Sequence, residues 1–155
     1  MKKPLLIAAM LTASAGAAGA ASETMTFTGT VSATCQITID SGGVLGASAD
    51  LMTLSTTEAG GSAGAATIQA SDASFQVTAV APASFTAAPA EGNTGITFAT
   101  FYSASGATAA ANVDGSVPTA LEAGLTNVSV DLQATKADGA FPAGEYSADV
   151  TITCE

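Results

Sequence analysis

The sequence predicts an all-β protein folded as a single β-sandwich, and three observations lead to that prediction. Residues 24–39 and 146–154 alternate between apolar and polar side chains, the period of a strand with one buried face. Segments rich in Gly, Pro and Asp separate several shorter stretches of the same kind. No apolar stripe with the 3.6-residue period of an amphipathic helix runs for ten residues, so the pattern favours a sandwich over βαβ units.

Residues 1–21 have the composition of a cleavable signal peptide. A basic start precedes an apolar stretch over residues 5–11, and small residues follow as far as Ala20 and Ala21, after either of which cleavage is expected. The apolar stretch is shorter than the roughly 20 residues that a transmembrane helix needs. We therefore expect export across the inner membrane, and no membrane span once the signal peptide is removed.

The charge of the chain excludes several classes of function. Its 155 residues include 13 acids, three basic residues and no histidine, and signal removal leaves Lys136 as the single cation. A nucleic-acid partner is not expected, because no basic surface is available to neutralise phosphates. A serine or cysteine nucleophile would lack a neighbouring base, and the acids are scattered through turns without the spacing of a metal-binding loop. The sequence thus predicts no enzymatic activity, no cofactor and no metal site.

The first alternating stretch, residues 24–39, is the strongest strand signal in the chain. One of its faces consists largely of threonine, a β-branched residue that favours strands. The apolar face consists of Met25, Phe27, Gly29, Val31, Ala33, Cys35, Ile37 and Ile39.

Four shorter strands are expected between the two ends of the chain, near residues 66–70, 74–80, 95–102 and 127–135. Each is bounded by turn-forming residues. The Ala-rich residues 103–111 contain Ser, Gly and Thr and have no apolar stripe, so we expect a loop there rather than a helix.

The last stretch, residues 146–154, predicts a strand with one apolar face. The side chains of that face are Tyr146, Ala148, Val150, Ile152 and Cys154. Polar residues occupy the positions between them, as expected of a half-exposed strand.

Cys35 and Cys154 lie on the apolar sides of the first and last predicted strands. A disulfide between them would close nearly the whole mature chain and contribute about 4 to 5 kcal/mol on a loop-entropy estimate. It requires the two Cα atoms to come within about 7 Å. An intermolecular disulfide and free thiols are the alternatives.

The two ends of the chain, residues 24–39 and 141–155, resemble the subunits of chaperone-usher pili, especially the archaic class grouped with spore coat protein U. In the first stretch, alternating apolar residues precede a cysteine. In the second, Gly144 and Tyr146 match the G-x-Y pattern of the terminal strand of those subunits.

This resemblance implies an immunoglobulin-like sandwich that lacks its final strand and is completed by a donor strand from another subunit. It implies a donor segment over residues 22–34, ahead of a β-sandwich domain over residues 35–155. The donor side chains would be Met25, Phe27, Gly29 and Val31, with Gly29 facing a shallow pocket. The strand that flanks the groove and contacts the chaperone would carry Tyr146, Ala148, Val150 and Ile152.

The implied function is that of a structural subunit of a fimbrium or surface fibre, associated with cell adhesion. Its partners would be identical or related pilus subunits, a periplasmic chaperone and an outer-membrane usher, and its location the cell surface after export through the periplasm.

One feature departs from the family, whose first cysteine usually pairs with a second on the next major strand, where this chain has none. A disulfide to Cys154 would tie the first and last strands together and could narrow or close the groove between them. The alternative is a self-contained secreted β-sandwich, an envelope or coat protein in which residues 24–39 form an edge strand of their own fold.

Overall fold

The computed structural model describes residues 19–155, so the predicted signal peptide lies almost entirely outside the described residues. The chain divides into two units between Thr30 and Val31. In the first, residues 19–30 form neither strand nor helix. The second contains all ten strands of the described part of the chain, and no helix occurs in residues 19–155.

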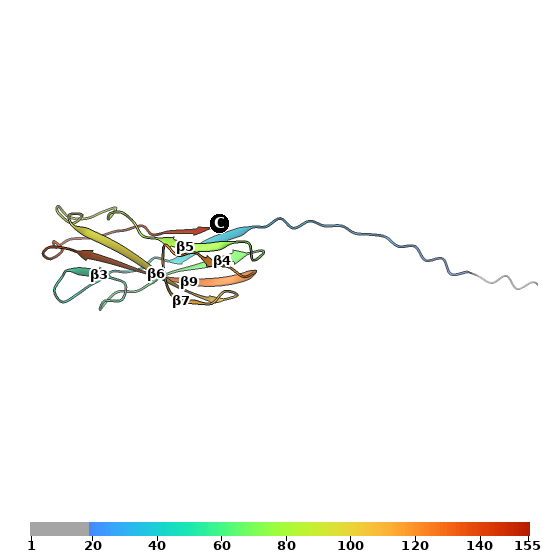
Figure 1. Ribbon diagram of the computed structural model, residues 1–155, viewed down its shortest axis with the longest axis horizontal. Coiled ribbons are helices and arrows are strands. Elements are labelled where there is room, and N and C mark those ends of the chain that lie inside the picture. Colours follow the sequence, from blue (N-terminus) through green and yellow to red (C-terminus); the bar gives the residue numbers. More distant parts are fainter. Residues whose placement is uncertain (1–18) are drawn as a thin grey trace, which may run out of the picture. The chain divides into compact units, whose positions relative to one another are not determined.

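The larger of the two antiparallel sheets is organised around one long strand, β9 (Gly124–Lys136). One edge of β9 pairs with β4 (Gly64–Ala70) and then with β3 (Thr53–Ser55), while β6 (Ile96–Gly106) pairs along its other edge. The outer strands of this sheet are β1 (Cys35–Ser41) beside β4, β2 (Gly46–Ala47) beside β3, and β7 (Ala110–Asp114) beside β6 (Figure 1).

The smaller sheet has three short strands in the order β10, β5, β8. Their bounds are Thr151–Cys154 for β10, Gln76–Val80 for β5 and Thr119–Ala120 for β8. β10 is an edge strand, since it pairs with β5 on one side and with no strand of the described chain on the other.

The core consists of two apolar clusters. The first contains residues of both sheets, among them Ile68, Val77, Tyr102 and Val128. The hydroxyl of Tyr102 lies within hydrogen-bonding distance of the backbone oxygens of Val77 and Val117, to which it can donate. The second cluster contains Leu54, Phe85, Ala134 and Phe141. Every buried side-chain polar atom of the described residues has a hydrogen-bond partner, as expected of a well-formed interior.

The predicted all-β sandwich is confirmed, and so are its four internal strands. The strands near residues 66–70 and 74–80 correspond to β4 and β5. Those near residues 95–102 and 127–135 correspond to β6 and β9, which extend further than expected because each pairs with the other over eleven positions.

Three local predictions differ from the structure. The strand expected over residues 24–39 begins only at Cys35, because an extended chain becomes a strand only where a neighbouring strand accepts its hydrogen bonds. Of residues 146–154, only the last four form a strand, although Ser147 makes an isolated bridge to Ala87. Residues 103–111, expected as a loop, instead contain the end of β6, a turn at Gly106 with φ of 106° and the start of β7.

Candidate binding groove

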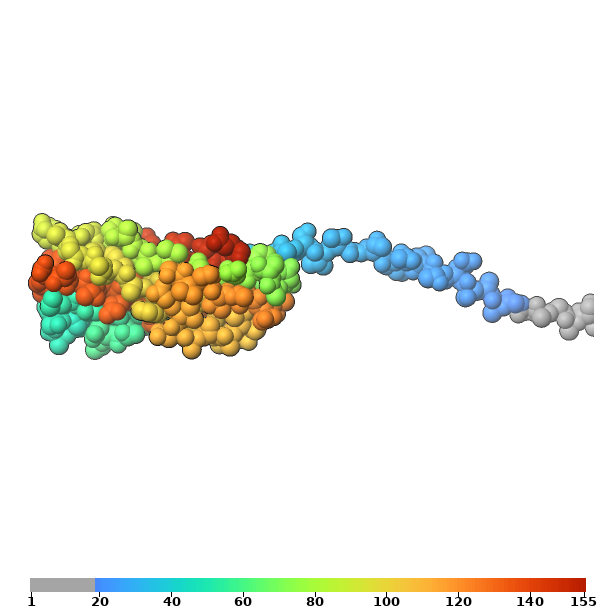
Figure 2. Space-filling model, in the orientation of Figure 1, coloured from blue at the N-terminus to red at the C-terminus, as the bar shows by residue number. Residues whose placement is uncertain are grey.

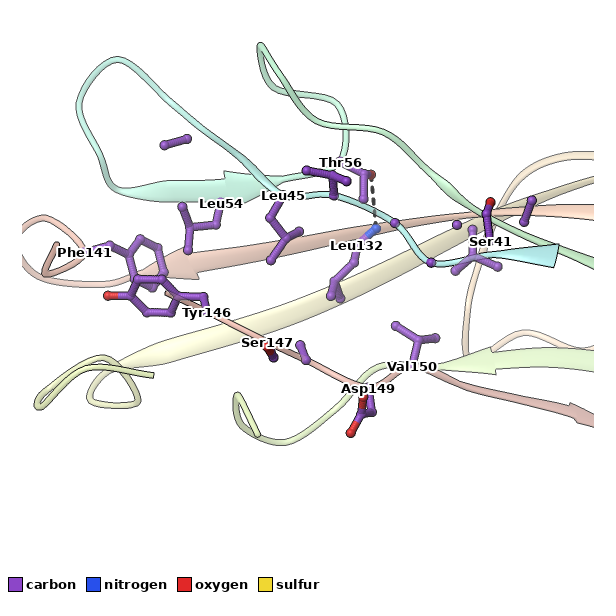
Figure 3. A pocket seen from close by; sticks show the side chains of 18 of the residues that line it. Ser41, Leu45, Leu54, Thr56, Leu132, Phe141, Tyr146, Ser147, Asp149 and Val150 are labelled. Carbon is purple, nitrogen blue, oxygen red and sulfur yellow. Dashed lines mark hydrogen bonds between the residues drawn. The ribbon is translucent and has the colours of Figure 1, made fainter. Parts of the chain in front are cut away.

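An apolar groove lies between the edge of β1 and the segment that leads into β10. It has a volume of about 940 Å³ and is lined only by residues of the unit that begins at Val31. Leu45, Leu54, Leu132 and Phe141 lie along one side of the cavity in Figure 3, and the side chain of Val150 lies on the other. The groove is therefore a gap in the sandwich with an apolar floor.

The floor comes from the large sheet and from the loop that follows β1. Leu132, on the inward face of β9, is fixed by a 3.3 Å hydrogen bond from its backbone N–H to the hydroxyl of Thr56 (Figure 3). Leu54 belongs to β3, and its side chain packs in one cluster with Phe85 and Phe141. After β1, two glycines and the bridge between Val44 and Ser62 bring Leu45 to the rim.

The backbone of β10 has one edge without a partner strand in the described chain. Ser147 and Glu155 exchange backbone hydrogen bonds with Ala87 and Gln76, so the odd-numbered residues direct their polar groups away from the groove. In an antiparallel pair the hydrogen-bonding direction alternates along the strand. The N–H and C=O groups of Ile152, the groove residue that belongs to β10, therefore point to the free edge of that strand.

One end of the groove is formed by aromatic side chains. Phe85 makes edge-to-face contacts with Phe98, Phe141 and Tyr146 at centroid distances of 4.8 to 6.0 Å. The hydroxyl of Tyr146 donates a 2.7 Å hydrogen bond to the backbone oxygen of Pro142. Burial raises the pKa of Tyr146, so its hydroxyl stays protonated to a higher pH than an ordinary tyrosine.

Lys136 contacts this aromatic end of the groove. Its side chain is buried, and its Nζ donates hydrogen bonds to the backbone oxygens of Glu91 and Thr94, at 2.8 and 2.7 Å. The same Nζ lies 5.7 Å from the centroid of the Phe141 ring, within the range of a cation–π interaction. The only cation expected in the mature chain thus joins the loop before β6 to the aromatic groove wall.

A disulfide joins Cys35 to Cys154, which confirms the intramolecular pairing. It joins the first residue of β1 to the last of β10, with the two Cα atoms 6.3 Å apart. In Figure 2 the C-terminal residues, in dark red, lie at the end of the sandwich where the chain enters its second unit. Neither cysteine lines the groove, and the lining residues of β1 and β10 are Ile39, Ser41 and Ile152.

Two aspartates outside the groove, Asp72 and Asp114, accept hydrogen bonds within turns. Hydrogen bonds from the hydroxyl and then the backbone N–H of Ser116 lower the pKa of Asp114, and Ser74 acts on Asp72 in the same way. These are Asx turns, in which a carboxylate satisfies nearby donors. Within residues 19–155, no three acidic, histidine or cysteine side chains are arranged to hold a metal ion.

The predicted donor side chains and groove side chains have different surroundings. Met25, Phe27 and Val31 are 78, 87 and 88% exposed, and the position of Gly29 is free of steric neighbours. Tyr146, Ala148, Val150 and Ile152 all line the groove and pack against the two core clusters.

Several lining residues could not have been found from the sequence. Phe141 and Leu45 lie in segments whose Gly, Pro and Asp content indicates turns, and neither has an alternating neighbourhood. For Leu132 a signal existed, since it lies on the apolar face of the strand expected over residues 127–135.

Comparison of the chain with protein-family models, curated proteins and solved structures gave no match. In residues 19–155 there is also no helix long and apolar enough to cross a membrane.

Proposed function

We propose that this protein is a non-enzymatic structural subunit of a secreted pilus or surface fibre, assembled by donor-strand complementation. The observation that supports this most directly is the apolar groove between the edges of β1 and β10. The proposed occupant is the segment of residues 22–34 from a second copy or a related subunit.

The groove has the properties of a surface that needs a partner. Ile39, Val44 and Leu51 line it and are 63, 52 and 49% exposed, an unfavourable state for large apolar side chains in water. The free edge of β10 lies beside them, and an unpaired edge next to apolar surface favours pairing with another chain.

Residues 22–34 have the chemistry of a strand that could fill this groove. Their alternation supplies one apolar face for the floor and one threonine face for solvent. Fully extended, the 13 residues would span about 43 Å at about 3.3 Å per residue. Strand addition of this kind gains affinity from main-chain hydrogen bonds and specificity from alternate side chains.

The direction of the chain argues against self-insertion of a strand antiparallel to β10. A strand antiparallel to β10 would have its N-terminal end beside Cys154 and its C-terminal end beside Tyr146. The chain's own segment ends at Thr34, which is bonded to Cys35 and therefore lies at the Cys154 end. A segment from another copy has no such restriction, and repetition of this head-to-tail contact produces an open fibre.

Export and assembly factors complete the proposal. The predicted signal peptide directs the chain to the periplasm, an oxidising compartment compatible with the disulfide between Cys35 and Cys154. A periplasmic chaperone would cover the groove until an outer-membrane usher exchanges it for a donor segment at the cell surface. This part of the proposal rests on the resemblance to chaperone-usher subunits.

One observation favours the alternative of a self-contained secreted envelope or coat protein. The disulfide ties β1 to β10, so the sandwich is already closed at one end without a partner. In that alternative the groove would stay empty or take a ligand, and residues 22–34 would have no assembly role.

The deciding experiment is gel analysis of the mature protein without reductant, boiled and unboiled, beside a variant that lacks residues 22–33. We expect a heat-sensitive ladder from the mature protein and a monomer from the deletion variant. A synthetic peptide of residues 22–34 should raise the melting temperature of the deletion variant, while the same peptide with Phe27→Asp should not.

A single monomer band in every lane, with no effect of the peptide on melting, would reject the fibre proposal. The same result would support the self-contained envelope or coat protein.

A further inference from the structure

Leu51 has a backbone conformation that an apolar side chain rarely adopts. Its φ is 58°, in the left-handed region, where the Cβ atom of an L-residue comes too close to a carbonyl oxygen. Within residues 19–155 a positive φ occurs at six glycines and at three other residues, Leu51, Glu91 and Asn112. Of these nine positions, only that of Leu51 carries an apolar side chain.

The strain is maintained by the loop between β2 and β3, whose hydrogen bonds determine the course of the chain. The N–H of Leu51 donates to the backbone oxygen of Ser48 at 2.9 Å, and the N–H of Thr53 donates to the hydroxyl of Ser48 at 3.0 Å. The carboxylate of Asp50 accepts a 3.0 Å hydrogen bond from the N–H of Met52. A residue stays in a sparsely populated conformation only where its surroundings determine it in this way.

The backbone contacts of Leu51 do not explain why the side chain is that of leucine. Its carbonyl oxygen accepts a 2.8 Å hydrogen bond from the N–H of Phe141, a contact that glycine could make equally well. Glycine adopts a positive φ without strain, and asparagine tolerates it. The Leu51 side chain is half exposed and belongs to neither core cluster, so the folding of a single copy gains little from it.

The same side chain lines the groove, on the loop that is bonded to Phe141. We infer that Leu51 is a binding residue for the donor segment, held in a strained conformation because its side chain contacts the apolar face of that segment. The inference rests on the proposed function, in which residues 22–34 of a second copy occupy the groove. Their binding would remove the apolar surface of Leu51 from water, a gain that offsets the backbone strain.

The first test is Leu51→Gly in the mature protein. Formation of the heat-sensitive ladder should slow about fivefold or more, the effect of losing the burial of part of a leucine side chain. The urea unfolding midpoint of the isolated monomer should change little, because relief of the strain offsets the loss of a half-exposed side chain. A slower ladder together with a large fall in the midpoint would show that Leu51 acts through the fold, and would overturn the inference.

Glu91→Gly is the matched control. It introduces glycine at another position with a positive φ, but Glu91 does not line the groove. The variant keeps the backbone oxygen that accepts a hydrogen bond from Lys136. We expect ladder formation at the wild-type rate, and equal slowing in the Leu51→Gly and Glu91→Gly variants would reject a role for the Leu51 side chain.

Two further substitutions separate the side chain of Leu51 from its backbone. Leu51→Asn keeps a residue that tolerates the left-handed conformation but is polar, so it should slow the ladder as much as Leu51→Gly. Leu51→Met keeps an apolar side chain of similar volume and should assemble within about twofold of the wild-type rate. A wild-type rate for the Leu51→Asn variant, or a loss of assembly in the Leu51→Met variant, would contradict the inference.

Failure of the proposed function gives a different result, because the mature wild-type protein would then form no ladder at all. In that case both the function and the role of Leu51 are rejected. If the wild-type ladder forms and the Leu51→Gly variant forms it at the same rate, only the role of Leu51 is rejected.

Discussion

The two sheets of this sandwich differ in how completely their strands are paired. In the large sheet, the 13-residue strand β9 has neighbouring strands on both edges, and further strands pair with those neighbours. In the small sheet, β10 has four residues and one free edge, and an apolar groove runs beside it. The large sheet is therefore the more completely paired of the two, and the proposed function places a partner at the free edge of the small sheet.

The largest expected effect is the loss of fibre assembly in a Phe27→Asp variant whose domain stability is unchanged. Phe27→Asp should abolish the ladder, because it would place an unpaired charge in the apolar groove of the next subunit. The unfolding midpoint of the domain should not change, since Phe27 lies outside the unit that contains the sandwich. Gel analysis and denaturant unfolding measure the two effects.

Thr28→Asp is the matched control, with the same added charge on the opposite face of the donor segment. Near-normal assembly is expected of it. Equal loss in both variants would mean that charge, and not the buried face, decides assembly.

The same substitution at two isoleucines compares the core with the groove. Ile68 is fully buried in β4, so Ile68→Ala should lower the free energy of unfolding by about 3 kcal/mol. Ile39 is mostly exposed beside the groove, so Ile39→Ala should cost much less stability but weaken assembly. Urea unfolding and ladder formation on both variants check this, and equal stability losses would contradict the separation of the two regions.

A smaller effect is expected at the aromatic end of the groove. Lys136→Met keeps the apolar stem but leaves the backbone oxygens of Glu91 and Thr94 without their donor, a loss of about 1 to 2 kcal/mol in the free energy of unfolding. Thr135→Met, on the outer face of β9, is the control and should be near neutral. A wild-type unfolding midpoint for the Lys136 variant would show that these contacts contribute nothing.

The smallest expected effect is a dependence on alkaline pH. Because burial raises the pKa of Tyr146, its contribution to stability is complete below about pH 10, the pKa of an unfolded tyrosine, and is lost as the pH rises through the higher folded value. Tyr146→Phe should flatten this part of the stability profile. Melting temperatures measured between pH 8 and pH 11 test it, and identical profiles for the two proteins would exclude the effect.

The sequence was most informative where a strand is long and has one buried face. Alternation at Val128, Val130 and Leu132 predicted the centre of β9, because such a strand exposes every second residue. It could not predict β2 or β8, whose two residues each are too few to show a period and depend on partners distant in the chain.

The groove was predictable on one side only. Residues 146–152 show their inward face by alternation, but Leu54 and Phe141 reach the groove through tertiary packing of segments rich in turn residues. For residues 24–34 the alternation predicts a strand, but these residues form none within the described chain, and only the proposed function would supply them with a partner.

The disulfide between Cys35 and Cys154 has a mechanical consequence for a fibre of the proposed kind. Tension would enter each subunit through the chain at Cys35 and leave it through the strand bound along β10. Since Cys154 ends β10, a covalent bond connects these two points directly. Pulling force would pass through that short connection and largely bypass the β1–β4 hydrogen bonds, so the rest of the sandwich would remain folded under stretch.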